Sequence, residues 1–369
     1  MSVDTGKKIL YIVQHRFNRS PGQRYRCEQY IKMLEKNGFS CTYSPIITNE
    51  EEDKSLYQSR SLFAKGTIFL KAIYRRLKDV IRASQYDIVF VYREAFMTGS
   101  LFFEKRLKAA GAKLVYDFDD AIWLPDVSEV NKSLAWLKRP GKTADIAALS
   151  DLVIVGNTYL ASYATNYNKN TVVFPSTIDM DYYRLPSGNR PYFNTGKVVI
   201  GWSGSHTTIK HFETILPVFE ALRKKYGERI HFVVYGDPHY TNDALAIEAL
   251  PWSHESEVDV IASFDIGIMP LPDNEWSKGK CAMKGLQYMG LSVPAVMSPV
   301  GMNTDVVQDG VNGFLAAEQE EWIEKLSLLI DNTELRKRIG AEGRKTVEEK
   351  FSVQALESRY LQIINSVLK

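Results

Sequence analysis

Residues 275–303 read EWSKGKCAMKGLQYMGLSVPAVMSPVGMN. This stretch predicts a polar loop, then a helix that stops at Gly290, and then a short apolar strand. Lys280, Lys284 and Gln287 are spaced i, i+4 and i+7, so we expect them to share one face of the helix. A loop, a helix and a buried strand in this order are typical of a parallel α/β sheet.

Two lysines crowd the predicted start of this helix, where unpaired N–H groups already carry partial positive charge. No acidic residue lies between positions 276 and 289 to offset Lys280 and Lys284. An anion held between the N–H groups and both ammonium groups would resolve this conflict, and phosphate is the usual one. The alternative is that both lysines are solvated on an exposed face.

The composition bounds the class of protein. The chain has 369 residues, 45% hydrophobic and 24% charged, which suits two globular α/β domains. A net charge of +2 argues against a general nucleic-acid binder. Cys27, Cys41 and Cys281 are scattered, which favours reduced thiols in a cytoplasmic protein and predicts no metal site. We find neither a membrane-spanning apolar run nor a signal-peptide core.

Short apolar runs alternate with helical patterns along both halves of the chain. The strands expected in the first half are 9–13, 88–92, 114–116, 152–155 and 172–174. Residues 184–197 are rich in Pro, Gly, Asn and Ser and are expected to form a linker. The strands expected after it are 198–202, 232–235, 266–269 and 294–297. Strands buried on both faces predict two doubly wound parallel sheets, with a ligand cleft at their carboxyl ends.

Two loops of the second domain have the composition of a ligand site. Residues 201–208, GWSGSHTT, link a strand to a helix, and their small residues would let backbone N–H groups approach a ligand. Thr207 or Thr208 is expected to cap the helix. Lys210 lies in the first turn of this helix, so it repeats the placement of a cation at a helix start described for Lys280 and Lys284. Asp237, in the turn YGDP, is either a ligand to a ribose or an ordinary turn residue. A tight β–α turn remains the alternative for the first loop.

The first domain contributes two charged clusters. Arg16, Arg19, Arg24 and Arg26 follow the first strand, and arginine binds phosphate or carboxylate through a bidentate fork. The alternative for this cluster is a solvated loop. The sequence Asp117-Phe118-Asp119-Asp120 follows a later strand, and its carboxylates repel one another unless they share a cation or a proton. Metal binding and pairing with the arginines are both solutions.

Residues 67–83, TIFLKAIYRRLKDVIRA, alternate apolar and basic positions. The apolar positions of the predicted helix are Ile68, Ile73, Leu77, Val80 and Ile81. Such a helix either packs on its own sheet or lies on an anionic membrane surface.

Several segments resemble the retaining GT-B glycosyltransferases, and specifically the large family 4, also called group 1. The similar segments in the second domain are IGWSGSHTTIKHFETILPVFEAL, VVYGDP, FDIGIMPL and KGKCAMKGLQYMGLSVPAVMSPVGMNTDVVQDGVNGFLA. The similar segments in the first domain are RYRCEQYIKMLEKNGF, VYDFDDAIW and VGNTYLASYA, which resemble a bacterial surface-polysaccharide subgroup. The resemblance implies two Rossmann-like domains facing a central cleft.

The resemblance also implies roles for named residues. A nucleotide-diphosphate sugar would be held by Ser203, Gly204, Ser205, Lys210, Gly236, Asp237, Gly279, Lys280, Cys281, Lys284, Gln287 and Asp305. We expect the acceptor or phosphate side to include Arg16, Arg24 and Arg26, and the catalytic groups to be Asp117, Asp119 and Glu94. The chain departs from the family pattern in its Glu-x7-Glu pair, where Gly279 and Gln287 stand. It also lacks the arginine that commonly precedes Lys210 and the usual first-domain histidine.

The domains expected are 1–183 on the acceptor side, 198–350 on the donor side, and a C-terminal helix, 351–369, returning to the first domain. The function expected is retaining transfer of a sugar to a glycan or lipid-linked acceptor in bacterial cell-surface polysaccharide synthesis. No cofactor, and no divalent metal, is expected. The location expected is the cytoplasm. Peripheral contact with the inner face of the plasma membrane through residues 67–83 is kept as the minority alternative to a helix packed on its own sheet. The alternatives are a metal-dependent transferase using Asp117 and Asp119, and a catalytically silent nucleotide-sugar-binding partner.

Overall fold

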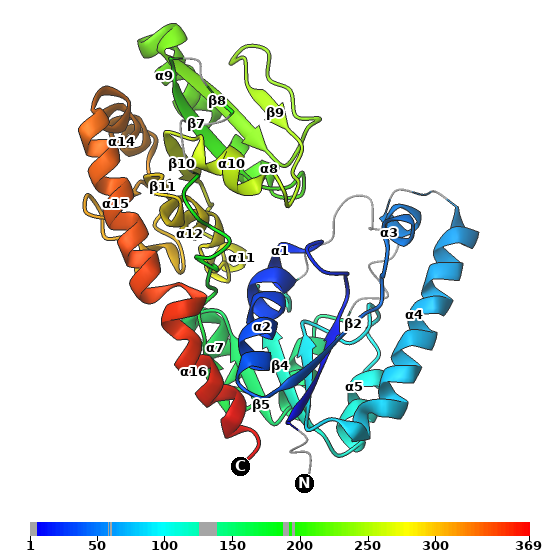
Figure 1. The fold of residues 1–369 in the computed structure, drawn as a ribbon. Coiled ribbons are helices and arrows are strands. Elements are labelled where there is room, and N and C mark those ends of the chain that lie inside the picture. Colours follow the sequence, from blue (N-terminus) through cyan, green and yellow to red (C-terminus); the bar gives the residue numbers. More distant parts are fainter. Residues whose placement is uncertain (1–5, 58, 60, 125–138, 187–191, 194–195) are drawn as a thin grey trace. The chain divides into compact units, whose positions relative to one another are not determined.

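The computed structural model describes residues 6–57, 59, 61–124, 139–186, 192–193 and 196–369 (Figure 1). The chain divides into two compact units. Unit 1 contains residues 1–175 and 357–369, and unit 2 contains residues 176–356. The division falls eight residues before the end expected for the first domain, because residues 176–183 pack with unit 2. Ile178 N–H, for example, donates to Phe351 O at 3.0 Å.

Unit 1 is built on a parallel sheet whose described strands are ordered β2-β1-β3-β4-β5-β6. These strands are β1 Lys8–Val13, β2 Ser40–Pro45, β3 Ile88–Tyr92, β4 Lys113–Phe118, β5 Leu152–Val155 and β6 Thr171–Val173. Strand order reverses between β1 and β3, so the loops after these two strands diverge. Ligands of open α/β sheets bind at such a point.

The helices of unit 1 cover this sheet. They are α1 Pro21–Gln23, α2 Gln29–Lys36, α3 Glu50–Tyr57, α4 Leu62–Arg82, α5 Phe102–Ala109, α6 Lys142–Leu149 and α7 Thr158–Ala164. A π-helical segment, Arg24–Glu28, joins α1 to α2, and a 3-10 turn, Ala83–Gln85, follows α4. Helical structure therefore continues from Pro21 to Lys36, and it is widened between Arg24 and Glu28. Single π-helical turns are frequent at functional sites.

Unit 2 repeats the architecture with the strand order β12-β11-β10-β7-β8-β9. Its strands are β7 Val198–Ser203, β8 Ile230–Tyr235, β9 Glu248–Leu250, β10 Ile266–Met269, β11 Ala295–Met297 and β12 Phe314–Leu315. Here the order reverses between β7 and β10. The core on one face of the sheet joins side chains of β7, β8, β10 and β11 to the helices α9 Leu216–Tyr226 and α14 Gln319–Asp331.

The other helices of unit 2 are shorter, apart from the last two. They are α8 Ile209–Glu213, α10 Glu257–Ala262, α11 Glu275–Lys278, α12 Met283–Gly290, α13 Asn303–Val306, α15 Thr333–Lys350 and α16 Val353–Ser366, with a 3-10 turn at Gly227–Arg229. The unit boundary falls inside α16, whose residues from Glu357 onward belong to unit 1. There Tyr360 stacks on Tyr30 with ring centroids 4.1 Å apart.

Three described strands were not predicted: β2, β9 and β12. All three lie at a sheet edge. An edge strand is covered on fewer sides, so its sequence need not be continuously apolar. The segment SCTYSP of β2, with one buried position, shows why the apolar-run criterion missed it.

An ion pair fastens α3 to α4. Arg75 donates to both oxygens of Glu52 at 2.7 and 2.8 Å, and Thr48 N–H donates to Glu52 Oε2 at 2.9 Å. Burial raises the pKa of the Glu52 carboxyl, but the hydrogen bonds from Arg75 and Thr48 outweigh it and hold this pKa at about 2, below the ordinary 4.5.

We expect this pair to make the stability of unit 1 depend on acid. Because the folded-state pKa of Glu52 is lowered, its stabilising contribution is complete above pH 4.5 and is lost as the pH falls toward 2. The expected loss is about 2 kcal/mol, reduced from the full shift because the Arg75 side chain is partly exposed. Urea unfolding of the native protein and of Glu52→Gln at pH 6 and pH 3 measures it. Equal acid sensitivity in both proteins would contradict the prediction.

Candidate functional site

The loops after β7 and β8 meet at the carboxyl edge of the unit 2 sheet. Gly204 N–H donates to Tyr235 O at 2.9 Å, and Gly236 N–H donates to Leu250 O at 2.8 Å. Gly236 has φ +120°, and a Cβ atom placed on it would lie 2.3 Å from Gly204 O. Only glycine fits this approach. Two predicted site residues from separate motifs therefore form one backbone surface.

Helix α12 is tied to the same edge. Ser203 N–H donates to the hydroxyl oxygen of Tyr288, on α12, at 2.8 Å. Ala282 precedes the helix with φ +55° and supplies no side-chain cap, which leaves the first N–H groups of α12 without that partner. Tyr288 was not among the predicted residues. Its position directly after Gln287, one of the predicted site residues, could have indicated it.

The three polar side chains expected on one face of α12 do not share it. Lys280 lies before the helix begins, and its Nζ is 5.2 Å from the ring centroid of Trp276. Lys284 is on the helix, with its Nζ 5.5 Å from the Trp202 ring centroid. Contact with an indole ring stabilises an ammonium group and so offsets part of the cost of placing a cation at a helix start. The same contacts orient the two ammonium groups.

Gln287 faces the interior of unit 2. Its side chain is 5% exposed, and its amide donates to Tyr183 Oη at 2.8 Å and to Glu257 Oε1 at 3.0 Å. This contradicts the expectation that Gln287 shares an accessible face with the lysines. The prediction failed for two reasons: Lys280 lies outside the helix, and the Gln287 amide is bound by the distant residues Tyr183 and Glu257.

The other predicted donor-side residues lie in the surrounding loops. Gly279 ends α11, and the buried Cys281 directs its Sγ toward Gly279 O at 3.7 Å. Lys210 is exposed on α8, and Ser205 bonds the Thr207 hydroxyl at 2.8 Å. Thr208 does occupy the N-cap position of α8, but its hydroxyl donates to Ser205 O instead of accepting from the helix, so the expected side-chain cap is not made.

Two carboxylates sit at the margins of these loops. Asp237 accepts from His239 N–H at 3.3 Å, which is an ordinary turn contact. Asp305 is exposed on α13. The turn before α13 approaches the lysine loop, because a Cβ atom on Gly301 would lie 2.8 Å from Lys278 O.

A hollow of about 460 Å³ opens at the same edge. Its lining comes from the ends of β10 and β11 and the starts of α9 and α14: Thr214, Ile215, Pro217, Val218, Leu271, Pro272, Asp273, Ser298, Pro299, Val300, Ala317, Glu318, Gln319 and Trp322. Ligands bind outside the carboxyl ends of parallel strands, so this hollow belongs to the candidate donor region.

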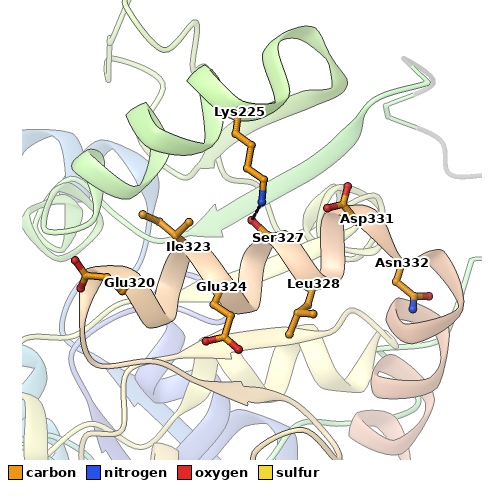
Figure 2. Close-up of a pocket in the computed structure, with 8 residues that line it drawn as sticks. All are labelled: Lys225, Glu320, Ile323, Glu324, Ser327, Leu328, Asp331 and Asn332. Atoms are coloured by element: carbon orange, nitrogen blue, oxygen red, sulfur yellow. Dashed lines mark hydrogen bonds between the residues drawn. The ribbon is translucent and has the colours of Figure 1, made fainter.

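A second hollow of about 660 Å³ lies between α9 and α14 (Figure 2). Figure 2 shows Lys225 donating to Ser327 Oγ, at 3.1 Å, across it. Its lining includes three carboxylates, Glu320, Glu324 and Asp331, and none of the residues predicted for the site. It therefore adds nothing to an anion-binding region.

In unit 1, the carboxylates at the end of β4 and in the turn after it are paired with arginines. Both oxygens of Asp117 accept from Arg26, at 2.9 and 2.6 Å, and Arg26 also donates to Phe174 O at 2.7 Å. The exposed fractions of these side chains are 2% for Arg26 and 1% for Asp117. Burial raises the pKa of the Asp117 carboxyl to about 6, against the lowering effect of Arg26. We therefore no longer place Arg26 on the acceptor side or Asp117 among the catalytic groups, because both side chains are buried and bound to each other.

Asp119 lies nearer the surface of the same edge. Its Oδ1 accepts from the Tyr92 hydroxyl at 2.8 Å and from Arg93 at 2.7 Å. Arg93 has φ +60° and also donates to Asp120 at 2.5 Å. A Cβ atom on Gly22 would meet the Tyr92 hydroxyl at 1.9 Å, so the first loop packs directly against this cluster. A strained, charged residue at a strand end is a feature of functional sites.

Glu94 and the remaining arginines also have protein partners. Glu94 accepts from Lys142 Nζ at 3.1 Å, and its side chain is 35% exposed. Arg16 donates to Asp53 at 2.6 Å, Arg19 pairs with the same carboxylate, and Arg24 is 7% exposed beside the Tyr25 ring. Tyr92, Arg93 and Lys142 were not predicted. Arg93 could have been found, because it follows a buried strand directly.

Among the described residues, no group of three or more His, Cys, Asp or Glu side chains is placed to hold a metal ion. Of the two solutions expected for the Asp117–Asp120 carboxylates, the structure uses arginine pairing.

Comparison with known proteins bears on both units. Residues 197–332 match the family model described as glycosyl transferases group 1. A capsular polysaccharide biosynthesis glycosyltransferase, CapM, of Staphylococcus aureus is 26% identical over 181 residues, 46% of this chain and 47% of CapM. The chain spans about half the length of this relative, or less for the other curated relatives that it matches.

Solved structures resemble the whole chain. Sucrose-phosphate synthase from Thermosynechococcus elongatus has a TM-score of 0.66 at 13% identity, covering 98% of this chain and 99% of its own. HepE of Anabaena, in complex with UDP and glucose, has a TM-score of 0.67 at 15% identity, covering 98% and 100%. These likenesses concern the fold, and that shared fold is GT-B.

Proposed function

We propose that this chain, which has the GT-B fold and carries a group 1 glycosyltransferase domain at residues 197–332, transfers a sugar from a nucleotide-diphosphate donor to a glycan or lipid-linked acceptor. The observation that carries the proposal is that several features of the candidate site meet where the strand order of unit 2 reverses, between β7 and β10. The glycine contact of the β7 and β8 loops, the uncapped start of α12 and two oriented lysines all belong to that edge.

Each of these features suits a diphosphate. Backbone N–H groups of the loop after Gly204 and at the start of α12 are proposed as donors, because such groups bind phosphate oxygens. Lys280, Lys284 and Lys210 supply positive charge where the leaving diphosphate gains negative charge. The chain then acts by orienting its substrates and stabilising that charge, and no protein nucleophile is needed. The sugar is transferred with retention, as the family 4 resemblance implies.

Unit 1 supplies the acceptor side. Asp119 and Glu94 are the polar groups proposed to meet the acceptor, with Arg16 and Arg24 beside the same edge. Asp119 is held by Tyr92 and Arg93 in one orientation, which suits a group that positions a hydroxyl. Because the carboxylates of the Asp117–Asp120 turn are paired with arginines, the reaction proposed needs no divalent metal.

The pathway proposed is bacterial cell-surface polysaccharide assembly, which the similarity to CapM supports. The enzyme would act in the cytoplasm at the inner face of the plasma membrane. Among the described residues, no helix combines the length and apolarity needed to span a bilayer. Peripheral contact with the membrane is proposed through the helix at residues 67–83.

The test is donor binding followed by turnover. Thermal-shift screening against UDP, GDP, ADP and dTDP sugars should give one stabilising base, and UDP is the first candidate because HepE was solved with it. Turnover with that donor should persist in EDTA. Loss of turnover restored by Mn²⁺ would favour the metal-dependent alternative. Donor binding without transfer to any free or lipid-linked acceptor would identify a silent binding partner.

We expect Lys280→Ala and Lys284→Ala each to weaken donor binding by about 2 kcal/mol, roughly 30-fold, because hydrogen bonds to charged groups are worth this much. Lys278→Ala is the matched control. It belongs to the same loop, but its ammonium pairs with Glu275 at 2.8 Å, so donor affinity should stay the same. Calorimetric affinities unchanged in both Lys280→Ala and Lys284→Ala would exclude these lysines from the site.

A further inference from the structure

The outward face of α4 carries a row of large apolar side chains that stay exposed among the described residues of unit 1. We call these residues the outer stripe. Their exposed fractions are 86% for Phe63, 68% for Leu70, 58% for Tyr74, 40% for Leu77 and 78% for Ile81. In Figure 1, α4 runs along the outer side of unit 1, next to α3 and α5. A contiguous exposed apolar face of this kind marks an interaction surface.

The spacing of the outer stripe is that of a single line along a helix. Successive members are separated by seven, four, three and four residues. At about 100° per residue, all five lie within a sector of about 60° and extend over roughly 27 Å. The sequence had suggested a different apolar stripe, which included Ile68, Ile73 and Val80. In the structure Ile68 is buried and the other two are half-buried.

The opposite face fastens α4 to the sheet through polar contacts. Arg76 is fully buried and donates to Ala95 O at 2.6 Å and to Ser44 O at 3.0 Å. It also pairs with Asp79 at 2.7 Å. Three carbonyl groups at strand ends and loops thus hold the helix: Ala95 O, Ser44 O and, as the third acceptor of Arg76, Val13 O. The helix packs on its own unit, and the outer stripe is still left facing outward.

The charges that α4 itself places beside the outer stripe are positive. Lys71 and Lys78 are both exposed and lie along one border of it. Lys71 Nζ is 3.6 Å from the buried Glu52 carboxylate of α3 while its side chain stays 53% exposed, and Lys78 Nζ is 4.5 Å from the Tyr74 ring centroid. The acidic residue of α4, Asp79, is 1% exposed and bound to Arg76 and Arg82. Long lysine stems allow the ammonium groups to reach a plane of phosphates while apolar side chains enter below it.

We infer that the outer stripe is a docking surface for an anionic phospholipid bilayer, with Phe63, Leu70, Tyr74, Leu77 and Ile81 entering the acyl boundary and Lys71 and Lys78 binding lipid phosphates. This inference rests on the peripheral membrane contact included in the proposed function and names its partner, and vesicle binding is measured independently of glycosyl transfer. A second copy of the chain is the less suitable occupant. A twofold pairing of the same face would bring the lysine borders of both copies toward one another, with no acidic side chain of α4 exposed to offset them.

Sedimentation with phospholipid vesicles tests this inference on the full chain. We expect binding to vesicles of equal parts phosphatidylglycerol and phosphatidylcholine to be at least about tenfold tighter than to pure phosphatidylcholine vesicles, because lysine–phosphate attraction adds to apolar insertion. The double variant F63S/I81S should lose at least about tenfold of the anionic-vesicle binding. Both positions are highly exposed, so its thermal unfolding should match that of the native chain.

The matched control is Leu328→Ser, an exposed leucine on α14 of unit 2 that should leave vesicle binding unchanged. K71A/K78A should reduce the preference for anionic vesicles while retaining weak binding. Vesicle binding retained in F63S/I81S, or absent from the native chain, would overturn the inference. A native dimer that F63S/I81S converts to a monomer would also overturn it, since the outer stripe would then join two copies. Donor affinity, measured in parallel, reports separately on the proposed function.

Discussion

Gly236→Ala should lower donor affinity by at least about 100-fold, which corresponds to about 2.7 kcal/mol. Gly236 has φ +120°, a region that residues with a side chain rarely occupy, and a Cβ atom there would lie 2.3 Å from Gly204 O. Backbone cannot rotate away as a side chain can, so the loop after β7 must move. That loop supplies the N–H groups proposed to bind the diphosphate.

The control for this variant separates backbone strain from damage to the site. Gly227 also has positive φ, +52°, but a Cβ atom there would meet nothing within 4 Å. Gly227→Ala should therefore cost about 1–3 kcal/mol of stability through backbone strain and leave donor affinity unchanged. Calorimetry with the donor identified by screening, together with circular dichroism, distinguishes the cases. Native donor affinity in a folded Gly236→Ala protein would place the diphosphate elsewhere.

Arg26→Met should destabilise unit 1 by about 3–5 kcal/mol, because it leaves the Asp117 carboxyl buried without its partner. Asp117 has both oxygens bound by Arg26 and is 1% exposed, so water cannot replace the guanidinium without opening the sheet edge. Urea unfolding monitored by tryptophan fluorescence measures the change. Arg26→Met combined with Asp117→Leu should recover much of the loss, since an apolar pair of similar volume needs no compensation.

A second arginine of the same sequence cluster is the control. Arg19 also pairs with a carboxylate, Asp53, but its side chain is 43% exposed and Asp53 keeps Arg16 as a partner. Arg19→Met should cost less than about 1 kcal/mol. If Arg26→Met lowered the free energy of unfolding no more than Arg19→Met, the buried pair would not stabilise unit 1. Arg26 would then again be a candidate for the acceptor side.

The comparison of these two arginines shows where prediction from sequence reached its limit. A run of arginines after a strand correctly marked a charged region at the carboxyl edge of the sheet. It could not say which guanidinium binds within the protein, because the partner of Arg26 lies 91 residues away. The same limit explains Gln287, whose partners Tyr183 and Glu257 are 104 and 30 residues distant.

The predictions of elements behaved differently for interior and edge strands. Interior strands such as β3 and β10 are buried on both faces, so each is an unbroken apolar run and was found within a residue or two. The edge strands β2, β9 and β12 lack this pattern. The glycines of the loops after β7 and β8 were also recognised from the sequence, although their mutual contact was not, since Gly204 and Gly236 belong to different motifs.

By itself, the sequence determined the two doubly wound sheets, the loops at their carboxyl edges and the amphipathic character of α4. These properties depend on residue type and short-range spacing, which burial and helical or strand periodicity translate directly into local structure. Only the tertiary structure decided which charged side chains pair with one another inside the protein, which glycines are in contact, and which side of α4 faces outward. Those outcomes depend on contacts between residues far apart in the chain, and local spacing carries no information about such partners.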